Sequence, residues 1–222
     1  MRTLAVIQAR MGSTRLPGKV MKHLANHPAL FWCYTRVKNA RTVDEVIVAT
    51  SHLSQDNPIA EFCQLNHWPC YRGSETDVLD RFYQSARPYQ PLGVVRITAD
   101  CPLIDPDLID LVVSAFYART PSVDYLSNVH PRTFPRGLDV EVASFCAIER
   151  AWRAAEDPYS REHVTPYLYQ HPELFRLASI TNTEDLSGLR WTLDTMEDYQ
   201  LINSLCEVID VTSPWSEILV RN

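Results

Sequence analysis

Short apolar runs alternate with longer segments of helical periodicity along the first half of the chain. The apolar runs predict buried strands over residues 3–7, 45–49, 69–71 and 93–97. The segments that follow them predict helices over residues 28–39, 58–66, 76–86 and 108–118. Strands that alternate with helices in this way are typical of a parallel sheet with helices on both faces. The first half therefore predicts an α/β fold.

The second half of the chain has a less regular pattern. Its apolar stretches predict strands over residues 124–128, 138–142, 175–181 and 189–193. Helical patterns cover residues 144–155, 161–170 and 196–208. Since there is no repeat, low-complexity segment or clear linker, we predict one domain over residues 1–222 with a mixed, mostly parallel sheet. An inserted subregion, about 125–185, is expected to cover a cleft or to form a dimer interface.

The loop after the first predicted strand concentrates cations and glycines. Residues 4–7 are apolar, and residues 8–19 then read QARMGSTRLPGK. This sequence contains Arg10, Gly12, Ser13, Thr14, Arg15, Gly18 and Lys19. The loop leaves the C-terminal end of a strand, where open α/β sheets bind ligands, and glycines let the backbone approach anionic oxygens. The loop matches neither a P-loop nor a dinucleotide fingerprint, so we predict a polyphosphate site of another kind, with a solvated basic loop as the alternative.

Composition limits the partners that the chain can have. The 222 residues are 45% hydrophobic and 22% charged, which is ordinary for a globular protein, and the net charge is −6. An acidic chain is not expected to bind nucleic acid in general. There is no apolar run of about 20 residues and no signal peptide, so we expect a cytoplasmic protein without membrane insertion. The six cysteines lack zinc-ligand spacing and are expected to be free thiols.

Two aspartates follow apolar strands at positions suited to a metal ion. Asp100 lies in RITADCPLIDP and Asp194 in RWTLDTMEDY, each between a predicted strand end and a helix. Mg²⁺ is usually held by one or two carboxylates together with phosphate oxygens and waters. If both strands lie near the first, the two carboxylates converge on one ion. The alternatives are a turn role for Asp100 and a helix N-cap role for Asp194.

Two further groups of polar residues are candidates for substrate contacts. The sequence PRGLDVEV (135–142) places Asp139 and Glu141 on one face of a predicted strand, where they could bond to sugar hydroxyls or face solvent. The sequence SREHVTPY (160–167) places Glu162 and His163 at a predicted helix start. A single histidine is more often structural than catalytic, so both readings stay open for His163.

Six motifs resemble, in order, those of the cytidylyltransferases of bacterial surface-sugar synthesis. They are QARMGSTRLPGK (8–19), SETDVLDRF (74–82), TADCPLIDP (98–106), PRGLDVEV (135–142), REHVTPY (161–167) and LDTMEDY (193–199). The chain is most similar to the spore coat polysaccharide biosynthesis protein F type. It is also similar to the enzymes that make CMP-ketodeoxyoctonate and CMP-acylneuraminate. The resemblance extends from residue 3 to about residue 205.

The resemblance implies a Rossmann-like nucleotide-diphospho-sugar transferase fold and a Mg²⁺-dependent reaction. CTP and a sugar, expected to be a sugar acid, would give a CMP-sugar and pyrophosphate. Arg10, Lys19 and Asp100 would be catalytic, and Asp100 and Asp194 would bind Mg²⁺. Arg15, Ser13 and the backbone at Ala9 and Gly12 would help Arg10 and Lys19 to hold the triphosphate.

The same resemblance implies the remaining substrate contacts. Asp77 and Arg81 would lie near the nucleoside, and Thr98 and Ala99 along its ribose and base. Asp139, Glu141, Glu162 and His163 would face the sugar. The chain has Gln8-Ala9-Arg10 where the ketodeoxyoctonate enzymes have proline, alanine and arginine, and Ala99-Asp100-Cys101-Pro102 where they have Gly-Asp-Glu-Pro. These differences leave the acceptor open.

Other functions remain compatible with the sequence. The chain could use another nucleoside triphosphate and a sugar 1-phosphate, or it could be a glycosyltransferase with Asp105-Pro106-Asp107 as its metal motif. A third alternative is a CTP-binding module without activity. We also expect a homodimer, because the aromatic residues Tyr159, Tyr167, Tyr169 and Phe175 could bury an interface, although they could equally cover the domain's own core.

Overall fold

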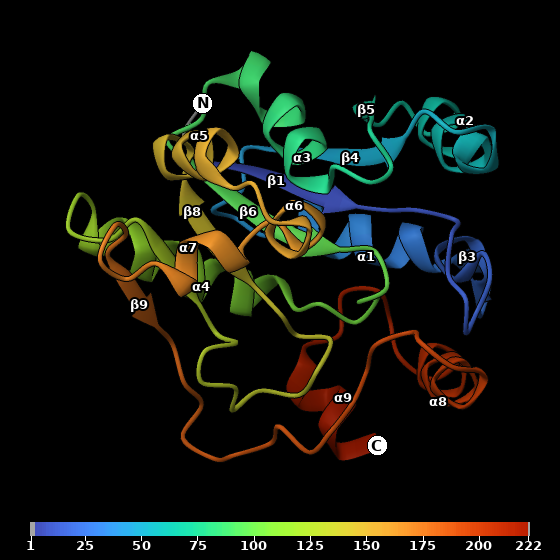
Figure 1. Ribbon diagram of the computed structural model, residues 1–222. Helices are drawn as coiled ribbons and strands as arrows, with labels where there is room; N and C mark the ends of the chain where they lie inside the picture. The colour runs from blue at the N-terminus through green and yellow to red at the C-terminus, as the bar shows by residue number, and fades with distance from the viewer. Residues whose placement is uncertain (1–2, 222) are drawn as a thin grey trace.

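The computed structural model describes residues 3–221. The centre of the fold is a sheet of seven strands (Figure 1). In chain order the strands are β1 (Thr3–Gln8), β4 (Glu45–Ser51), β5 (Cys70–Gly73), β6 (Gly93–Thr98), β7 (Tyr125–Ser127), β8 (Glu141–Ser144) and β9 (Leu177–Ser179). Their order across the sheet is β5-β4-β1-β6-β8-β7-β9. A separate hairpin pairs β2 (His23–Leu24) with β3 (His27–Pro28).

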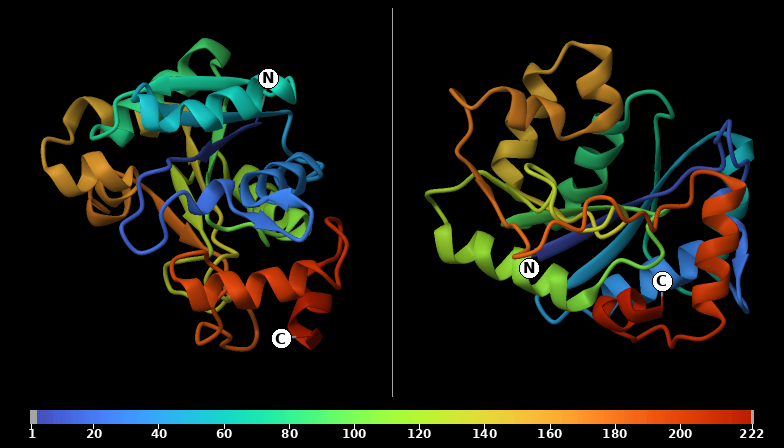
Figure 2. Two further views of the ribbon diagram at one scale, coloured as in Figure 1. Left: turned by 90° about the vertical axis from the view of Figure 1, so that its right-hand side faces the viewer. Right: turned by 90° about the horizontal axis from the view of Figure 1, so that it is seen from below.

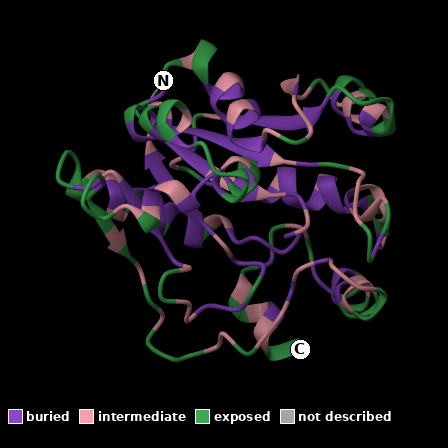
Figure 3. Ribbon diagram, viewed as in Figure 1, coloured by how far each residue is buried: buried purple, intermediate pink, exposed green. Residues whose placement is uncertain are grey.

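Helices cover both faces of the sheet, as the alternating pattern predicted (Figure 2). On one face lie α3 (Val78–Ala86), α5 (Phe145–Ala154) and α7 (Pro166–Gln170), with α6 (Pro158–His163) beside α3. On the other face lie α1 (Ala29–Lys38), α2 (Asn57–Leu65), α4 (Pro106–Arg119), α8 (Met196–Cys206) and α9 (Trp215–Arg221). The inner strands β1, β4, β6, β7 and β8 are mostly buried, whereas the edge strands β5 and β9 are partly exposed (Figure 3). The predicted mixed, mostly parallel α/β fold is thus confirmed.

The strand order creates a switch point between β1 and β6. From β1 the chain passes to β4 and β5, and then crosses to β6 on the opposite side of β1. All four strands are parallel, and Gln8 at the end of β1 pairs with Thr98 at the end of β6. Loops that leave such a switch point diverge and open a crevice at the C-terminal ends of the strands. The loop after β1 and the loop after β6 therefore meet at one place.

The predicted subregion 125–185 extends the sheet. Strand β8 is antiparallel to β6 and to β7, and β9 is parallel to β7. Tyr167, Tyr169 and Phe175 pack against the chain's own core, whereas Tyr159 is exposed. These three side chains therefore serve the fold itself, and homodimer formation stays a prediction.

Three predicted elements differ from the structure. Residues 189–193 form no strand; the segment makes one bridge, between Arg136 and Arg190. Gly137, at φ +103°, allows this approach because a Cβ there would lie 2.6 Å from the Trp191 carbonyl oxygen. The predicted strand 138–142 begins only at Glu141. The predicted helix 161–170 is broken into α6 and α7 by a turn at Val164.

Small polar side chains cap the starts of α3, α4, α5, α6 and α8. Asp105 caps α4, with Pro106 at its first position as predicted, and Asp77 caps α3. The helix predicted from Pro58 begins one residue earlier, at Asn57. No helix among residues 3–221 is both long and apolar enough to cross a membrane.

Candidate active site

A pocket of about 740 Å³ opens at the C-terminal ends of β1 and β6. The loop after β1 supplies one wall, and β6 with the loop after it supplies another. The lining residues are Gln8, Ala9, Arg10, Gly12, Ser13, Thr14, Arg15, Lys19, Val20, Gln55, Glu75, Val78, Arg81, Arg96, Thr98, Asp100, Glu162, His163 and Asp194. The pocket thus lies at the switch point and contains the whole cationic set of the first loop.

The first loop is held in shape by bonds at both ends. Met11 N donates to the buried carboxylate of Asp56 at 2.7 Å, and Gly18 N donates to the Met11 carbonyl at 3.1 Å. Gly18 adopts φ +67°, which glycine accepts without strain. Leu16 is buried in the loop, and a short 3-10 helix, η1 (Lys19–Met21), follows. The backbone that carries Lys19 is therefore well defined.

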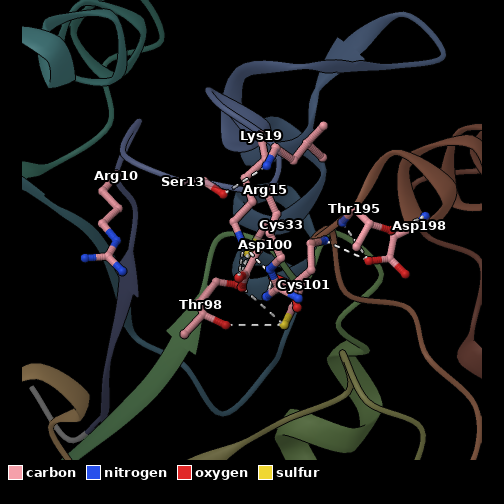
Figure 4. Close-up of polar contacts among 12 residues, drawn as sticks. Arg10, Ser13, Arg15, Lys19, Cys33, Thr98, Asp100, Cys101, Thr195 and Asp198 are labelled. Atoms are coloured by element: carbon pink, nitrogen blue, oxygen red, sulfur yellow. Dashed lines mark hydrogen bonds and ion pairs between the residues drawn. The ribbon is translucent and has the colours of Figure 1, made fainter. Parts of the chain in front are cut away.

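Lys19 bonds to both of the aspartates that the sequence singled out. Figure 4 labels Lys19 and Asp100 among the surrounding polar residues. Its Nζ donates to Asp100 Oδ2 at 2.6 Å and to Asp194 Oδ1 at 2.8 Å. Burial lowers the pKa of Lys19, but the two carboxylates outweigh this effect and raise its pKa above the usual value. For Asp194, burial acts to raise the pKa, and Lys19 with nearby arginines brings it below the usual value. The convergence of Asp100 and Asp194, predicted from sequence, is therefore present.

The surroundings of Asp194 settle which residue caps α8. Thr195 is the N-cap and forms a capping box with Asp198, so Asp194 is free of that role. Arg190 bonds to Asp194 Oδ2 at 3.0 Å and to Asp198 Oδ2 at 2.9 Å. Leu193 N donates to the Asp100 carbonyl at 2.8 Å. Asp194 was predicted to follow a strand end. It follows an irregular segment, and this segment places it beside Asp100.

The donor set suits Mg²⁺ bound together with a phosphate ligand. Asp100 and Asp194 each direct one carboxylate oxygen to the same cation, the Lys19 ammonium. Within the described residues no three His, Cys, Asp or Glu side chains are grouped as a metal site. Two carboxylates with phosphate oxygens and waters are a usual Mg²⁺ environment, so these residues fit that ion.

Part of the pocket lining comes from η2 (Ser54–Asp56) and α3, together with the segment between β5 and α3. Gln55 donates to Glu75 at 2.8 Å, and Arg81, which is 2% exposed, donates to the Ser74 carbonyl. The predicted nucleoside contact Asp77 does not line the pocket. Its carboxylate caps α3 and pairs with Arg161 of α6. Asp77 therefore joins the two helices at the rim.

The pocket lining also includes Arg96, Thr98, Glu162 and His163. The chain turns sharply after His163, because Val164 adopts φ +74° and Thr165 N donates to the His163 carbonyl at 2.9 Å. This γ-turn of the rarer hand is strained for a β-branched residue. It ends α6 so that Glu162 and His163 stand at the rim. Glu162 lies 3.8 Å from Arg10 across the opening.

Asp139 and Glu141 are not part of the pocket lining, contrary to the prediction. Glu141 is buried and bonds to Arg96 and Tyr125, and burial, which acts to raise its pKa, is outweighed by Arg96 so that the pKa lies below the usual value. Asp139 is paired with Arg132. A buried carboxylate needs a cation nearby, and Arg96 stands opposite Glu141 in the strand register.

Most of the sequence-predicted residues meet in the pocket, and four do not. Asp77, Ala99, Asp139 and Glu141 lie outside its lining; Ala99 is 1% exposed and its N–H donates to the Gln8 carbonyl. Six lining residues were not among the candidates from the sequence: Gln8, Val20, Gln55, Glu75, Val78 and Arg96. Arg96 could have been singled out from the sequence, because it is the one charged residue inside the apolar run GVVRIT (93–98).

Two other chemical candidates have structural roles. Asp105 of the Asp105-Pro106-Asp107 sequence is buried and bonds to Leu108 N and Trp215 N, so it is not placed as a metal ligand. Cys101 is buried beside Asp100, and burial holds its pKa well above the usual value. Its thiol is therefore not an activated nucleophile.

Comparison with known proteins finds relatives over most of the chain. A model of the cytidylyltransferase family matches residues 4–218. The chain is 36% identical to the spore coat polysaccharide biosynthesis protein SpsF of Bacillus subtilis, over 91% of this chain and 85% of the relative. It is 26% identical to the 3-deoxy-manno-octulosonate cytidylyltransferase of Chlamydia trachomatis, over 84% and 80%.

A solved structure extends the likeness to three dimensions. The structure of a cytidylyltransferase from Leptospira borgpetersenii is similar with a TM-score of 0.94 at 33% identity, covering 100% of this chain and 93% of that one. The family model covers nearly the full length, and the resemblance seen in the six motifs is thereby confirmed. This chain belongs to the cytidylyltransferase family.

Proposed function

We propose that this protein transfers CMP from CTP to a hydroxyl of a sugar acid and releases pyrophosphate, with Mg²⁺ as cofactor. The observation that carries the proposal is the meeting of Asp100, Asp194 and Lys19 at the switch point beside a glycine-containing cationic loop. A phosphoryl group bound there would have cations on one side and carboxylates on the other. Family membership makes a nucleoside triphosphate the expected donor.

The residues of the first loop would neutralise the triphosphate. Arg10 and Arg15 are exposed enough to reach phosphate oxygens, with side chains 47% and 61% accessible. Arginine suits bidentate phosphate contacts, and Lys19 adds a point charge. Charge that develops on the leaving pyrophosphate would be offset by these three side chains, and such preorganised contacts lower the barrier for in-line displacement.

Mg²⁺ held by Asp100 and Asp194 would supply a Lewis acid at the reacting phosphate. The protein's own contribution is the placement of these carboxylates. Arg190 fixes the outer oxygen of Asp194, and the Leu193–Asp100 backbone bond fixes the distance between the two segments. Because both carboxylates are only about a quarter exposed, their charges are weakly screened by water.

Arg96 supports an acidic acceptor. It lines the pocket, one of its Nη atoms pairs with Glu141, and its Nε is buried with no hydrogen-bond partner among residues 3–221. A carboxylate on the sugar could meet this guanidinium. The Chlamydia trachomatis relative is named for a sugar acid, 3-deoxy-manno-octulosonate, which agrees with this class.

A nucleotide panel tests the proposed donor. We expect CTP with Mg²⁺ to raise the melting temperature more than UTP, ATP, GTP or dTTP does, because a ligand that binds only the folded state stabilises it. A larger shift with another nucleotide would move the function to a different sugar-nucleotide enzyme. CTP binding without pyrophosphate release for any sugar would favour a binding module. Sugar acids are then screened for pyrophosphate release.

Replacing Arg96 by lysine tests the acceptor class. The Arg96→Lys variant keeps a cation for Glu141 but loses the second N–H group that would bond to the acceptor. We expect the acceptor KM to rise by roughly 10- to 100-fold, the loss of one charge-assisted hydrogen bond, with the CTP-induced melting shift unchanged. The assay is pyrophosphate release with the sugar acid found in the screen. Arg153→Lys, in an exposed pair on α5, is the control, and an unchanged KM for Arg96→Lys contradicts the assignment.

A further inference from the structure

We propose that Lys19 occupies the cation position between Asp100 and Asp194 until a nucleoside triphosphate draws its ammonium away, so that the divalent ion enters with the nucleotide and not before it. The inference rests on the proposed function, because it takes a triphosphate and a divalent ion as ligands of this site. It assigns to Lys19 a positioning role in addition to phosphate binding. In the ligand-free protein, Lys19 holds the two carboxylates together.

The Lys19 ammonium occupies the position between the two carboxylates. Lys19 Nζ bonds to the two inner carboxylate oxygens, Asp100 Oδ2 at 2.6 Å and Asp194 Oδ1 at 2.8 Å. The outer oxygen of Asp194 is bonded to Arg190. A divalent ion that lay between the two carboxylates, where the ammonium now lies, would need Asp100 Oδ2 and Asp194 Oδ1, which the ammonium uses. The ammonium, whose side chain is 13% exposed, must therefore leave first.

The balance of charges around Lys19 also favours binding of the divalent ion together with the nucleotide and not before it. Three carboxylates (Asp100, Asp194 and Asp198) face three cations, Lys19, Arg15 and Arg190. A divalent ion that entered alone would add two positive charges to a balanced, partly buried cluster, where screening is weak. A triphosphate brings negative charge that gives Lys19 and Arg15 new partners. The carboxylates then lose their partners at the moment when a metal ion arrives to replace them.

The side chain can move while its backbone stays in place. The loop backbone is closed by the Gly18–Met11 bond, and Val20 beside Lys19 is buried. A lysine ammonium sits on a flexible four-carbon stem, so it can turn from the carboxylates to a phosphate without a change in the loop. The two carboxylates line the same pocket as the loop residues that would hold the phosphates.

Manganese binding in the absence of nucleotide tests the proposal. Mn²⁺ serves as the probe, and free Mn²⁺ is measured by electron paramagnetic resonance during titration of the whole protein. We expect Lys19→Met to bind Mn²⁺ about tenfold or more tightly than the wild type, equivalent to about 1.4 kcal/mol. Lys38→Met removes the same charge on an exposed helix end and is expected to leave the affinity unchanged.

Two further variants make the outcome decisive. The double variant Lys19→Met, Asp194→Asn should lose the gain, because the ion would no longer have both carboxylates; a gain that persists there overturns the proposal. Equal affinity in wild type and Lys19→Met overturns it as well, and Lys19→Gln replaces Lys19→Met if the latter melts early. The nucleotide panel on the wild type is independent: absence of a CTP shift counts against the proposed function, whereas the Mn²⁺ result still reports on Lys19.

Discussion

Replacing Asp100 by asparagine is expected to lower kcat for pyrophosphate release by about 10³-fold or more while the fold is retained. Asparagine has the same shape but no charge, so the Lys19 ammonium and the proposed Mg²⁺ each lose one of two carboxylates. The backbone carbonyl of Asp100 still accepts the Leu193 N–H, which keeps the segment of Asp194 in place. The effect should therefore appear in turnover and not in stability.

Steady-state kinetics and thermal melting together check this expectation. The matched control is Asp107→Asn on α4, because Asp107 is 77% exposed and pairs only loosely with Arg41. Asp107→Asn should leave both kcat and the melting temperature close to those of the wild type. An Asp100→Asn enzyme that retains a tenth of the wild-type kcat would show that Asp100 holds neither a metal ion nor a reacting group.

The fold was predictable where local pattern and tertiary environment agree. The parallel strands β1, β4 and β6 and their helices were found from apolar runs because both faces of these strands are buried, which leaves a continuous apolar signal. Residues 189–193 were misassigned because an apolar run also marks an irregular segment: Trp191 and Leu193 are buried as a strand would be, yet the segment makes only one bridge. The burial of side chains therefore does not show whether the backbone pairs with a neighbouring strand.

The site residues also divide into those that the sequence located and those that it did not. The contiguous loop residues and Asp100 were found because each follows a strand end, and parallel strands bring such positions to one edge. Glu141 was misplaced because its partner, Arg96, lies 45 residues away in sequence and is opposed only through strand register. Period-two alternation shows which residues share a face, but it does not show whether that face meets a pocket or a buried arginine.

The largest effect on stability is expected at Arg36, far from any motif. Arg36 is fully buried, and its guanidinium donates to the carbonyls of Ile104, Val211 and Ser213 at 2.6 to 2.8 Å. Asp105, which caps α4, lies 3.8 Å away and is 1% exposed. One side chain thus ties α1 to the loop after β6 and to the segment before α9.

Substituting methionine at Arg36 should lower the free energy of unfolding by about 3–5 kcal/mol, since the apolar stem remains but three carbonyls and the Asp105 carboxylate stay buried without their cation. Urea denaturation measures the change as a lower midpoint at an unchanged slope. Arg153→Met, which removes an exposed i,i+4 pair with Glu149, should cost about 0.5 kcal/mol or less. If both variants lose equally little, the buried guanidinium is not what holds the C-terminal segment to the sheet.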